Sequence, residues 1–263
     1  MDLGLRDRVY VITGASRGLG LAAARVLVAE GARVVLTGRD GAAVTAAAAE
    51  LGGSGVARAV AADNADPEAA TRAVAAARDA FGRLDGALIS GPSPRVGHLD
   101  EDTEQDWRDA FESVFLGALR MARTVAEATG AGGSIALVLS TTVRVPIAQL
   151  SISTGLRPGL AMMVQLLADE LGRAGIRVNG LLPGRITTDS LREIDDAPGA
   201  APPAGGTDGT GARPYARARD RAALRRDADP EEFARLAVFV LSPASSYVTG
   251  SSVVMDGGSL RVP

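Results

Sequence analysis

The sequence predicts a single α/β domain built on a doubly wound parallel sheet of about seven strands, with helices on both faces. Short apolar runs bounded by turn residues alternate along the chain with longer segments whose apolar residues recur at helical spacing. The first run, residues 9–12, leads through a glycine-rich turn directly into such a segment. Because 263 residues with 46% apolar content suffice for one buried core, we expect one domain over residues 1–263.

The strand predictions depend on continuous apolar runs, which are typical of parallel strands covered on both faces. The runs occupy residues 9–12, 33–37, 56–61, 86–90, 134–139, 176–182 and 252–255. Apolar spacing predicts helices over residues 42–51, 103–105, 106–128, 156–172 and 230–241. Asp66, Pro67 and Glu68 are expected to open a further helix with a cap and a proline at its first position. The buried positions expected within residues 106–128 are Trp107, Phe111, Val114, Leu116 and Leu119.

A glycine-rich turn, residues 13–20 with the sequence TGASRGLG, joins the first strand to the first helix. Gly14, Gly18 and Gly20 have no Cβ atom, so the backbone can turn sharply and an anion can come close to the helix N-terminus. Unpaired N–H groups and the positive end of the helix dipole favour a negative charge there. The turn therefore predicts a site for a dinucleotide pyrophosphate, and the alternative is that it is only a turn.

Composition excludes several kinds of site. The chain has no cysteine and one histidine, so we expect no disulfide, no thiolate catalysis and no metal site. The net charge of −3 argues against nucleic acid as a partner. The charged N-terminus is unlike a signal peptide, and no uncharged stretch of about 18 residues appears, so we expect a cytoplasmic protein that does not interact with membranes. All 28 basic residues are arginines, so no lysine can take part in chemistry.

Three motifs follow the pattern of one enzyme family. The turn at residues 13–20 reads TGxxxGxG, and Pro183, Gly184, Ile186 and Thr188 form a PGxxxT turn after the sixth strand. The run YVTG precedes the last strand and DGG follows it. Together these motifs resemble the short-chain dehydrogenase/reductase family over nearly the whole chain. The resemblance implies a Rossmann-like fold and a nicotinamide dinucleotide cofactor.

The resemblance also implies which residues contact the cofactor. Asp63 would touch the adenine ring, although it could equally be a turn residue. Ser90 and Gly91 lie in the turn after the fourth strand, where the family usually has the sequence NNAG. The backbone at Ile186 and the hydroxyl of Thr188 would hold the nicotinamide carboxamide. The full set implied by the resemblance is Gly14, Ser16, Arg17, Gly18, Leu19, Gly20, Arg39, Asp63, Ser90, Gly91, Pro183, Gly184, Ile186 and Thr188.

The end of the second strand favours NADP(H) over NAD(H). Gly38 stands where NAD-preferring members of the family carry an acidic residue that binds the ribose 2′-hydroxyl. Arg39 follows it, and Arg17 lies within the glycine turn, so two guanidinium groups are available for a 2′-phosphate. The alternative is that both are solvated surface arginines.

The candidate catalytic residues are Ser140, Ser153 and Arg157, separated by thirteen and four residues. In the family this spacing belongs to Ser, Tyr and Lys. The segment resembles an atypical branch among homologues of 3-oxoacyl-carrier-protein reductases, in which SxxxR replaces YxxxK. By this resemblance Ser140 would orient a carbonyl, Ser153 would take the acid position and Arg157 would bind the nicotinamide ribose. The alternative is that both serines are ordinary strand-end and helix-cap residues.

Proton transfer is the step that these replacements weaken. An alkyl hydroxyl is a much weaker acid than a phenol, and arginine donates hydrogen bonds without releasing a proton. Val114 also stands where the family commonly has an asparagine that serves in a proton relay. Proton transfer would therefore need help from water, His98, Tyr215 or the substrate, although a histidine such as His98 is more often a loop side chain.

Residues 190–229 are the least regular stretch, rich in proline and glycine and basic in their second half. Their place after the sixth strand is that of the family's substrate lid, and a linker without such a role is the alternative. The basic residues could meet an acyl thioester or polyketide-like carbonyl substrate, or form a solvated face.

These observations predict an NADP(H)-dependent oxidoreductase that transfers a hydride between nicotinamide and a small-molecule carbonyl or alcohol at an altered catalytic centre. One alternative is a homologue that binds the nucleotide without redox activity, as a regulatory or partner subunit. Another is a non-redox lyase or isomerase in the same cleft. The resemblance implies a homodimer or homotetramer.

Overall fold

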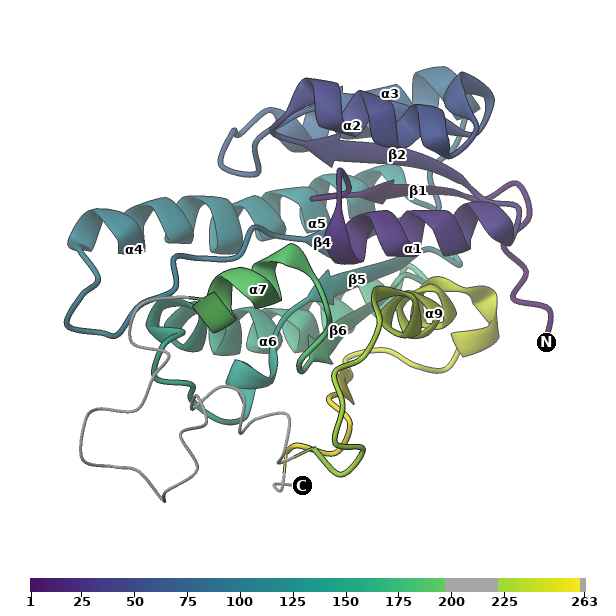
Figure 1. Ribbon diagram of the computed structural model, residues 1–263. Coiled ribbons are helices and arrows are strands. Elements are labelled where there is room, and N and C mark those ends of the chain that lie inside the picture. The colour runs from purple at the N-terminus through teal and green to yellow at the C-terminus, as the bar shows by residue number, and fades with distance from the viewer. Residues whose placement is uncertain (197–221, 261–263) are drawn as a thin grey trace.

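A parallel seven-stranded sheet runs through the middle of the molecule, in the order β3-β2-β1-β4-β5-β6-β7 (Figure 1). The computed structural model describes residues 1–196 and 222–260. The chain winds outward from β1 in one direction to β3 and then crosses to β4 on the other side. The carboxyl ends of β1 and β4 therefore border the crevice where ligands of such sheets bind. This is the doubly wound, Rossmann-like fold that the sequence predicts.

Each strand lies within one residue of its predicted bounds. Each is parallel to its neighbours, and the β1–β4 pair sets Val11 opposite Ala87. The strands are β1 (Val9–Ile12), β2 (Arg33–Gly38), β3 (Ala57–Ala61), β4 (Gly86–Ser90), β5 (Ser134–Val138), β6 (Arg177–Pro183) and β7 (Ser252–Met255).

Helices cover both faces of the sheet (Figure 1). They are α1 (Gly18–Ala29), α2 (Gly41–Glu50), α3 (Ala69–Phe81), α4 (Glu104–Ala110), α5 (Gly117–Ala128), α6 (Ser151–Gly172), α7 (Asp189–Asp196) and α9 (Pro230–Leu241). Shorter turns are η1 (Gly53–Gly55), η3 (Thr141–Val143) and η4 (Pro243–Ser245), and a π-helical segment, η2 (Phe111–Leu116), joins α4 to α5. Among the helices of the described residues, none combines the length and apolar character needed to cross a bilayer.

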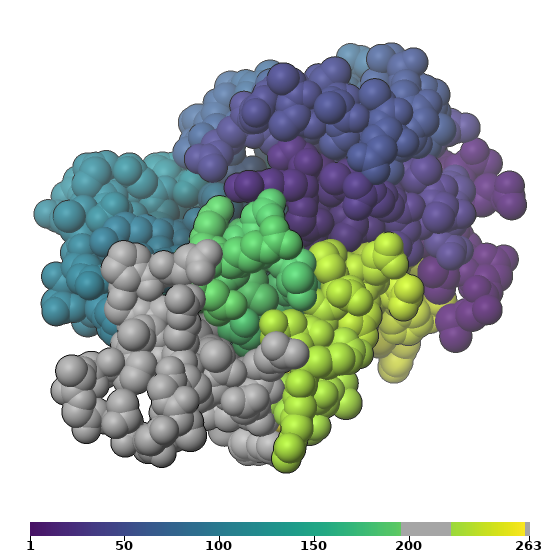
Figure 2. All heavy atoms as spheres, in the orientation of Figure 1, coloured from purple at the N-terminus to yellow at the C-terminus, as the bar shows by residue number. Residues whose placement is uncertain are grey.

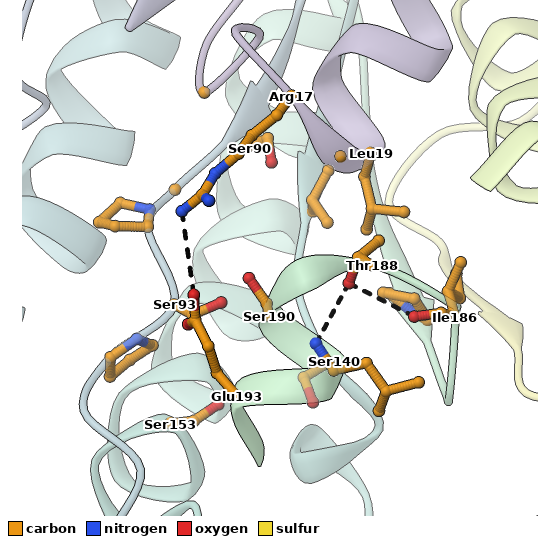
Figure 3. Close-up of a pocket in the computed structure, with 18 of the residues that line it drawn as sticks. Arg17, Leu19, Ser90, Ser93, Ser140, Ser153, Ile186, Thr188, Ser190 and Glu193 are labelled. Carbon is orange, nitrogen blue, oxygen red and sulfur yellow. Dashed lines mark hydrogen bonds and ion pairs between the residues drawn. The ribbon is translucent and has the colours of Figure 1, made fainter. Parts of the chain in front are cut away.

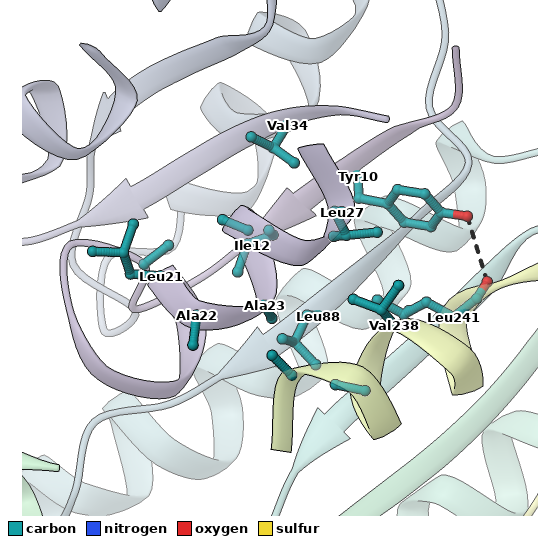
Figure 4. Packing of buried hydrophobic residues seen from close by; sticks show 14 of the residues in the cluster. Tyr10, Ile12, Leu21, Ala22, Ala23, Leu27, Val34, Leu88, Val238 and Leu241 are labelled. Carbon is teal, nitrogen blue, oxygen red and sulfur yellow. Dashed lines mark hydrogen bonds between the residues drawn. The ribbon is translucent and has the colours of Figure 1, made fainter. Parts of the chain in front are cut away.

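The core has two halves because strand side chains alternate between the faces of the sheet. Tyr10 and Ile12 pack against α1 and α9, where the Tyr10 hydroxyl donates to the carbonyl of Leu241 at 3.4 Å (Figure 4). Val9 and Val11 face the other way, into a cluster formed with α3, α5 and α6. The sheet is thus buried on both sides, and its carboxyl edge is left to form the site.

Four local predictions differ from the structure. Helix α3 begins at Ala69, because the Asp66 carboxylate accepts the Glu68 N–H at 2.9 Å and so closes a separate turn before the helix. Helix α6 begins at Ser151, five residues before the predicted start. Phe111 is 42% exposed, stacked on Phe115 with ring centroids 5.2 Å apart. The stretch predicted to be irregular from residue 190 opens with helix α7.

Candidate functional site

A cavity of about 360 Å³ lies at the carboxyl ends of the central strands (Figure 3). It is bordered by the glycine turn, the turn after β4, the start of α6, the turn after β6 and helix α7. Of the predicted site residues, all but Gly20 line this cavity. Residues far apart in the sequence are therefore brought to one place, as the motifs predict.

The glycine turn is held closely against β4. A Cβ atom on Gly14 would lie 2.7 Å from the Ser90 carbonyl oxygen, and one on Gly20 would lie 2.6 Å from the Gly14 oxygen. The Thr13 hydroxyl donates to the Ser90 carbonyl at 2.9 Å and accepts the Ser90 N–H at 2.8 Å. Gly20 is thus required for packing inside the turn, which explains why it does not face the cavity.

The N-terminus of α1 fits an anionic ligand. Its N-cap residue, Arg17, makes no side-chain capping bond, and the first turn of the helix carries no acidic residue. A Cβ atom on Gly18 would meet no protein atom within 4 Å, so the space before the turn is open. Free N–H groups beside an open cavity are what a dinucleotide pyrophosphate requires.

The two arginines predicted to contact a 2′-phosphate both line the cavity. Arg39 is exposed and lines the cavity beside Gly38, and Arg17 lines it from the glycine turn. Asp63 lines it as well, and its carboxylate accepts the Ala65 N–H at 2.9 Å. Asp63 is thus a turn residue, as its alternative role predicts, and one of its carboxylate oxygens is already hydrogen-bonded. It still lines the cavity.

The turn after β6 also borders the cavity. A Cβ atom on Gly184 would lie 2.8 Å from the Cα atom of Asp256, so the turn packs against the chain after β7. The Thr188 hydroxyl accepts the Leu191 N–H at 3.3 Å and lies 3.4 Å from the Ile186 carbonyl oxygen (Figure 3). Thr188 therefore begins α7 as well as facing the cavity.

The candidate catalytic residues form one hydrogen-bonded group. Arg157 lies one helical turn after Ser153, and its Nε donates to the Ser153 hydroxyl at 3.1 Å. The Thr142 hydroxyl lies 3.3 Å from the same oxygen, and the Thr142 N–H donates to Ser140 Oγ at 3.2 Å. Both serines are therefore held by neighbours. Ser140 is also the N-cap of the short helix η3, which is the alternative stated for it, whereas the N-cap of α6 is Leu150, so Ser153 is not a cap.

Arg157 is a buried cation without a counter-charge among the described residues. Only 7% of it is exposed, and its Nη1 donates to the carbonyls of Val138 at 2.8 Å and Leu139 at 3.2 Å. Burial lowers the pKa of Arg157 to about 10, and no carboxylate contributes to the shift. In the described part of the chain every buried side-chain nitrogen has a hydrogen-bond partner, and no bond involves Nη2. Nη2 is therefore accessible, and it faces the cavity that Arg157 lines.

Several groups considered for proton transfer are not part of this cavity. Among the described residues neither His98 nor a tyrosine lines it, and Tyr215 lies outside those residues. Val114 is 2% exposed and belongs to the core, as expected. It lies in the π-helical segment η2, with its Cα atom 3.9 Å from where a Cβ atom on Gly91 would be.

Sequence reasoning missed five polar residues of the site, and two of them, Asn64 and Ser93, line the cavity from the turns after β3 and β4. Thr142 joins Ser140 to Ser153, and its place two residues after Ser140 is the only sequence signal for it. Ser190 and Glu193 line the cavity from α7, in a stretch predicted to have no regular structure. Residues 197–221 of the predicted lid, which include most of its arginines, lie outside the described residues, whereas Arg225 and Arg226 are described and exposed.

Comparisons with known proteins agree with the motifs. A family model described as enoyl-(acyl carrier protein) reductase matches residues 14–259. L-Rhamnose 1-dehydrogenase (NAD(P)(+)) of Azotobacter vinelandii is 35% identical over 270 residues, which cover 97% of each chain. The structure of L-sorbose reductase from Gluconobacter frateurii, complexed with NADPH and L-sorbose, matches with a TM-score of 0.85 and 29% identity over 100% of both chains. A short-chain dehydrogenase from Burkholderia cenocepacia in complex with NADP matches with a TM-score of 0.82 and 31% identity, covering 97% of this chain and 99% of that one. On the motifs, the fold and these matches, the chain belongs to the short-chain dehydrogenase/reductase family of oxidoreductases.

Proposed function

We propose that the protein is an NADP(H)-dependent oxidoreductase that transfers a hydride between the nicotinamide and a small carbonyl or alcohol. The observation that carries the proposal is the single cavity, which joins an uncapped helix N-terminus, two arginines and the Ser140, Ser153 and Arg157 group. The bound coenzyme would supply the hydride chemistry. The residues of this chain bind, orient and stabilise charge.

The preference for the phosphorylated coenzyme is supported by charge. Arg17 and Arg39 offer two guanidinium forks that line the same cavity as the catalytic group, and a guanidinium suits a phosphate dianion. Gly38 has no carboxylate to accept a ribose 2′-hydroxyl. The NADP and NADPH in the two related structures agree with this preference.

The altered catalytic centre acts by hydrogen bonding and by fixed charge. Ser153 Oγ accepts from Arg157, and when the Thr142 hydroxyl also donates to it, the Ser153 hydrogen is available to a substrate oxygen. Ser140 Oγ accepts the Thr142 N–H and can donate to the same oxygen. The guanidinium behind Ser153 stabilises negative charge on that oxygen during hydride transfer to a carbonyl. The proton that completes the alcohol comes from water, since no phenol among the described residues lines the cavity.

The catalytic end of the cavity supports a polar small substrate. Hydroxyl groups from Ser93, Ser140 and Ser190 line it together with apolar residues such as Val96 and Leu150. The names of two relatives give L-rhamnose and L-sorbose as their substrates. A hydroxylated carbonyl compound or polyol is therefore the first class to test, and an acyl thioester or polyketide-like carbonyl is the second.

The test combines binding with turnover. Calorimetry with NADPH and NADH measures coenzyme binding, and absorbance of the reduced coenzyme follows its oxidation with ketoses, aldoses, 3-oxoacyl thioesters and quinones. The proposal expects tight NADPH binding and turnover with at least one class. Failure of both coenzymes to bind at millimolar concentration contradicts it. The double variant Ser153→Tyr with Arg157→Lys then tests whether Ser153 and Arg157 have a catalytic role of their own. If they do, the double variant loses native activity.

A second candidate is a coenzyme-binding protein without redox activity, serving as a regulatory or partner subunit. It is favoured by one observation: the only described tyrosines are Tyr10, buried in the core, and Tyr247, fully exposed away from the cavity. Tight NADPH binding with no oxidation across the whole panel supports this candidate. Substrate conversion without any change in the coenzyme would instead indicate a lyase or isomerase.

The dimer or tetramer implied by the family stays a prediction. Large apolar side chains on α6 and the neighbouring η2 are exposed, including Met162 at 56%, Leu166 at 52% and Phe111. Such residues are more frequent where subunits meet than on free surfaces. Light scattering on the purified protein measures the oligomeric state directly.

A further inference from the structure

Arg17 reaches from the glycine turn across the mouth of the cavity to helix α7 (Figure 3). Its Nη1 lies 3.6 Å from a carboxylate oxygen of Asp189, and its Nη2 lies 4.0 Å from one of Glu193. The three side chains are 54% to 66% exposed, so these ion pairs are long and solvated. Asp189 also pairs with Arg192 of the same helix at 3.3 Å. An arginine placed to meet a coenzyme phosphate is thus already shared with two carboxylates.

Helix α7 is fixed in this position. At its first turn the Leu191 N–H donates to the Thr188 hydroxyl. Near its other end Arg185, whose side chain is 11% exposed, makes two hydrogen bonds to the Asp195 carboxylate, at 2.8 and 2.9 Å. Arg185 also binds Asp227 at 2.8 Å, and these carboxylates raise its pKa. Figure 2 shows α7 on the outer face of the molecule, beside the N-terminal part of the chain. Because α7 is anchored, Asp189 and Glu193 stay near the cavity when a ligand enters.

We propose that Asp189 and Glu193 are specificity-determining residues that compete with the coenzyme 2′-phosphate for Arg17. The inference depends on the proposed function, since it concerns the same coenzyme. When the phosphate takes Arg17, Glu193 loses its ion pair with Arg17 and Asp189 is left with Arg192, so both carboxylates favour the state in which Arg17 stays beside α7. They therefore weaken NADPH binding, whereas NADH, which has no 2′-phosphate, is unaffected. Asp189 and Glu193 therefore reduce the preference for NADPH that Arg17 and Arg39 create, and they keep the ratio of NADPH affinity to NADH affinity moderate.

The test is coenzyme binding by calorimetry to the isosteric double variant Asp189→Asn with Glu193→Gln. From the size of exposed ion pairs we expect the NADPH dissociation constant to fall about threefold to tenfold at low salt. The NADH dissociation constant should not change. At about 0.5 M salt most of the difference should disappear, because the charges are exposed.

Two further variants make the test specific. Asp7→Asn with Glu50→Gln removes two carboxylates that pair with exposed arginines, Arg33 at 3.0 Å and Arg25 at 2.8 Å, and that do not line the cavity. This control should leave both coenzymes unaffected. In an Arg17→Met background, the α7 substitutions should improve NADPH binding by a smaller factor, since the competition has been removed.

The outcomes separate this inference from the proposed function. If the wild-type protein binds neither coenzyme, both this inference and the proposed function are refuted. If NADPH binds and the α7 substitutions change nothing, only the competition is refuted. If they weaken NADPH and NADH alike, the carboxylates instead hold Arg17 over a bound coenzyme, and the competition is again refuted. The inference is supported only by a gain confined to NADPH that the distant control does not reproduce.

Discussion

Replacing Arg157 by methionine tests whether this buried charge lacks a counter-charge. A buried cation normally has a carboxylate partner, and removing one member of such a pair costs about 3–5 kcal/mol. Within residues 1–196 and 222–260, Arg157 has only neutral acceptors, namely Ser153 and the carbonyls of Val138 and Leu139. Burial lowers the pKa of Arg157 to about 10, and this lowering corresponds to about 3 kcal/mol for burying the charge.

The expected change in stability is small because two effects oppose each other. The variant no longer buries a charge, which stabilises the folded state. It also loses three hydrogen bonds, each of which contributes about 1 kcal/mol net to the free energy of unfolding. We therefore expect Arg157→Met to alter the free energy of unfolding by less than about 1.5 kcal/mol. The accessible Nη2 is lost as well, so NADPH affinity should fall about tenfold or more. A site residue would then be shown to contribute to binding while adding little to stability.

Arg185→Met is the matched control. Arg185 is also largely buried, but it binds the carboxylates of Asp195 and Asp227. Its removal takes the Arg185 ion pair away from both carboxylates, and because both are partly exposed we expect a loss of about 1–3 kcal/mol. Urea unfolding followed by circular dichroism, with m-values compared, measures both variants. A loss above about 3 kcal/mol for Arg157→Met would refute the reasoning, since it would reveal a compensating charge.

The same comparison has a pH dependence with a definite sign. The folded-state pKa of Arg157 lies below its unfolded value, so the unfolded chain binds the proton more tightly. Its burial therefore costs stability at every pH below about 10, and the cost falls only as the pH rises through that value. Between about pH 5 and 9 the stability difference between wild type and Arg157→Met should be constant. A difference that changes near neutral pH would indicate a second titrating group.

Three further predictions concern specificity, proton transfer and positioning. A Cβ atom on Gly38 would meet Ser16 and Val44 only at ordinary contact distance, 3.5 Å, so Gly38→Asp should fold. In calorimetry this variant should bind NADPH about tenfold more weakly and NADH more tightly. Because His98 does not line the cavity, His98→Ala should keep the reduction rate within about twofold, and a larger loss would assign His98 a part in proton transfer. Thr142→Val removes the hydroxyl beside Ser153 and should lower kcat about tenfold without changing KM for NADPH. Thr142→Ser keeps a hydroxyl and should retain the wild-type rate. An equal loss of kcat in both variants would assign Thr142 a packing role.

The strands were predictable because each is a short apolar run whose burial on both faces leaves a plain sequence pattern. The start of α6 was not, because residues 151–155 are small and mostly polar and show no helical spacing. Tertiary packing decides this turn: Ile152 is fully buried, and a Cβ atom on Gly155 would lie 2.5 Å from the Trp107 ring. The helix therefore begins early because a neighbouring aromatic ring fits over its glycine.

The membership of the site was predictable, but its electrostatics were not. Motif spacing identified the lining residues, since the carboxyl ends of parallel strands must meet at one edge. It did not show that Arg157 turns to the carbonyls after β5, or that Arg17 faces an acidic helix, because both depend on side-chain directions set by distant segments. Glu193 lies in the stretch from residue 190 whose composition predicted irregular structure, and Asp189 directly precedes it, so their distance from Arg17 had no sequence signal.

Ser153 and Arg157 are best understood as one unit instead of two separate replacements. They lie one helical turn apart, and the bond from Nε to Oγ fixes the direction in which the serine can donate. A lone Arg157→Lys keeps a charge but loses the planar fork that reaches Ser153 and Val138 at once, so Ser153 is released. A lone Ser153→Tyr introduces a phenol but removes the acceptor of the buried Nε, which then lacks a partner. Each single substitution should therefore lose more activity than the double variant does. A double-mutant cycle measured on turnover would contradict this coupling if the effects of the two substitutions were additive.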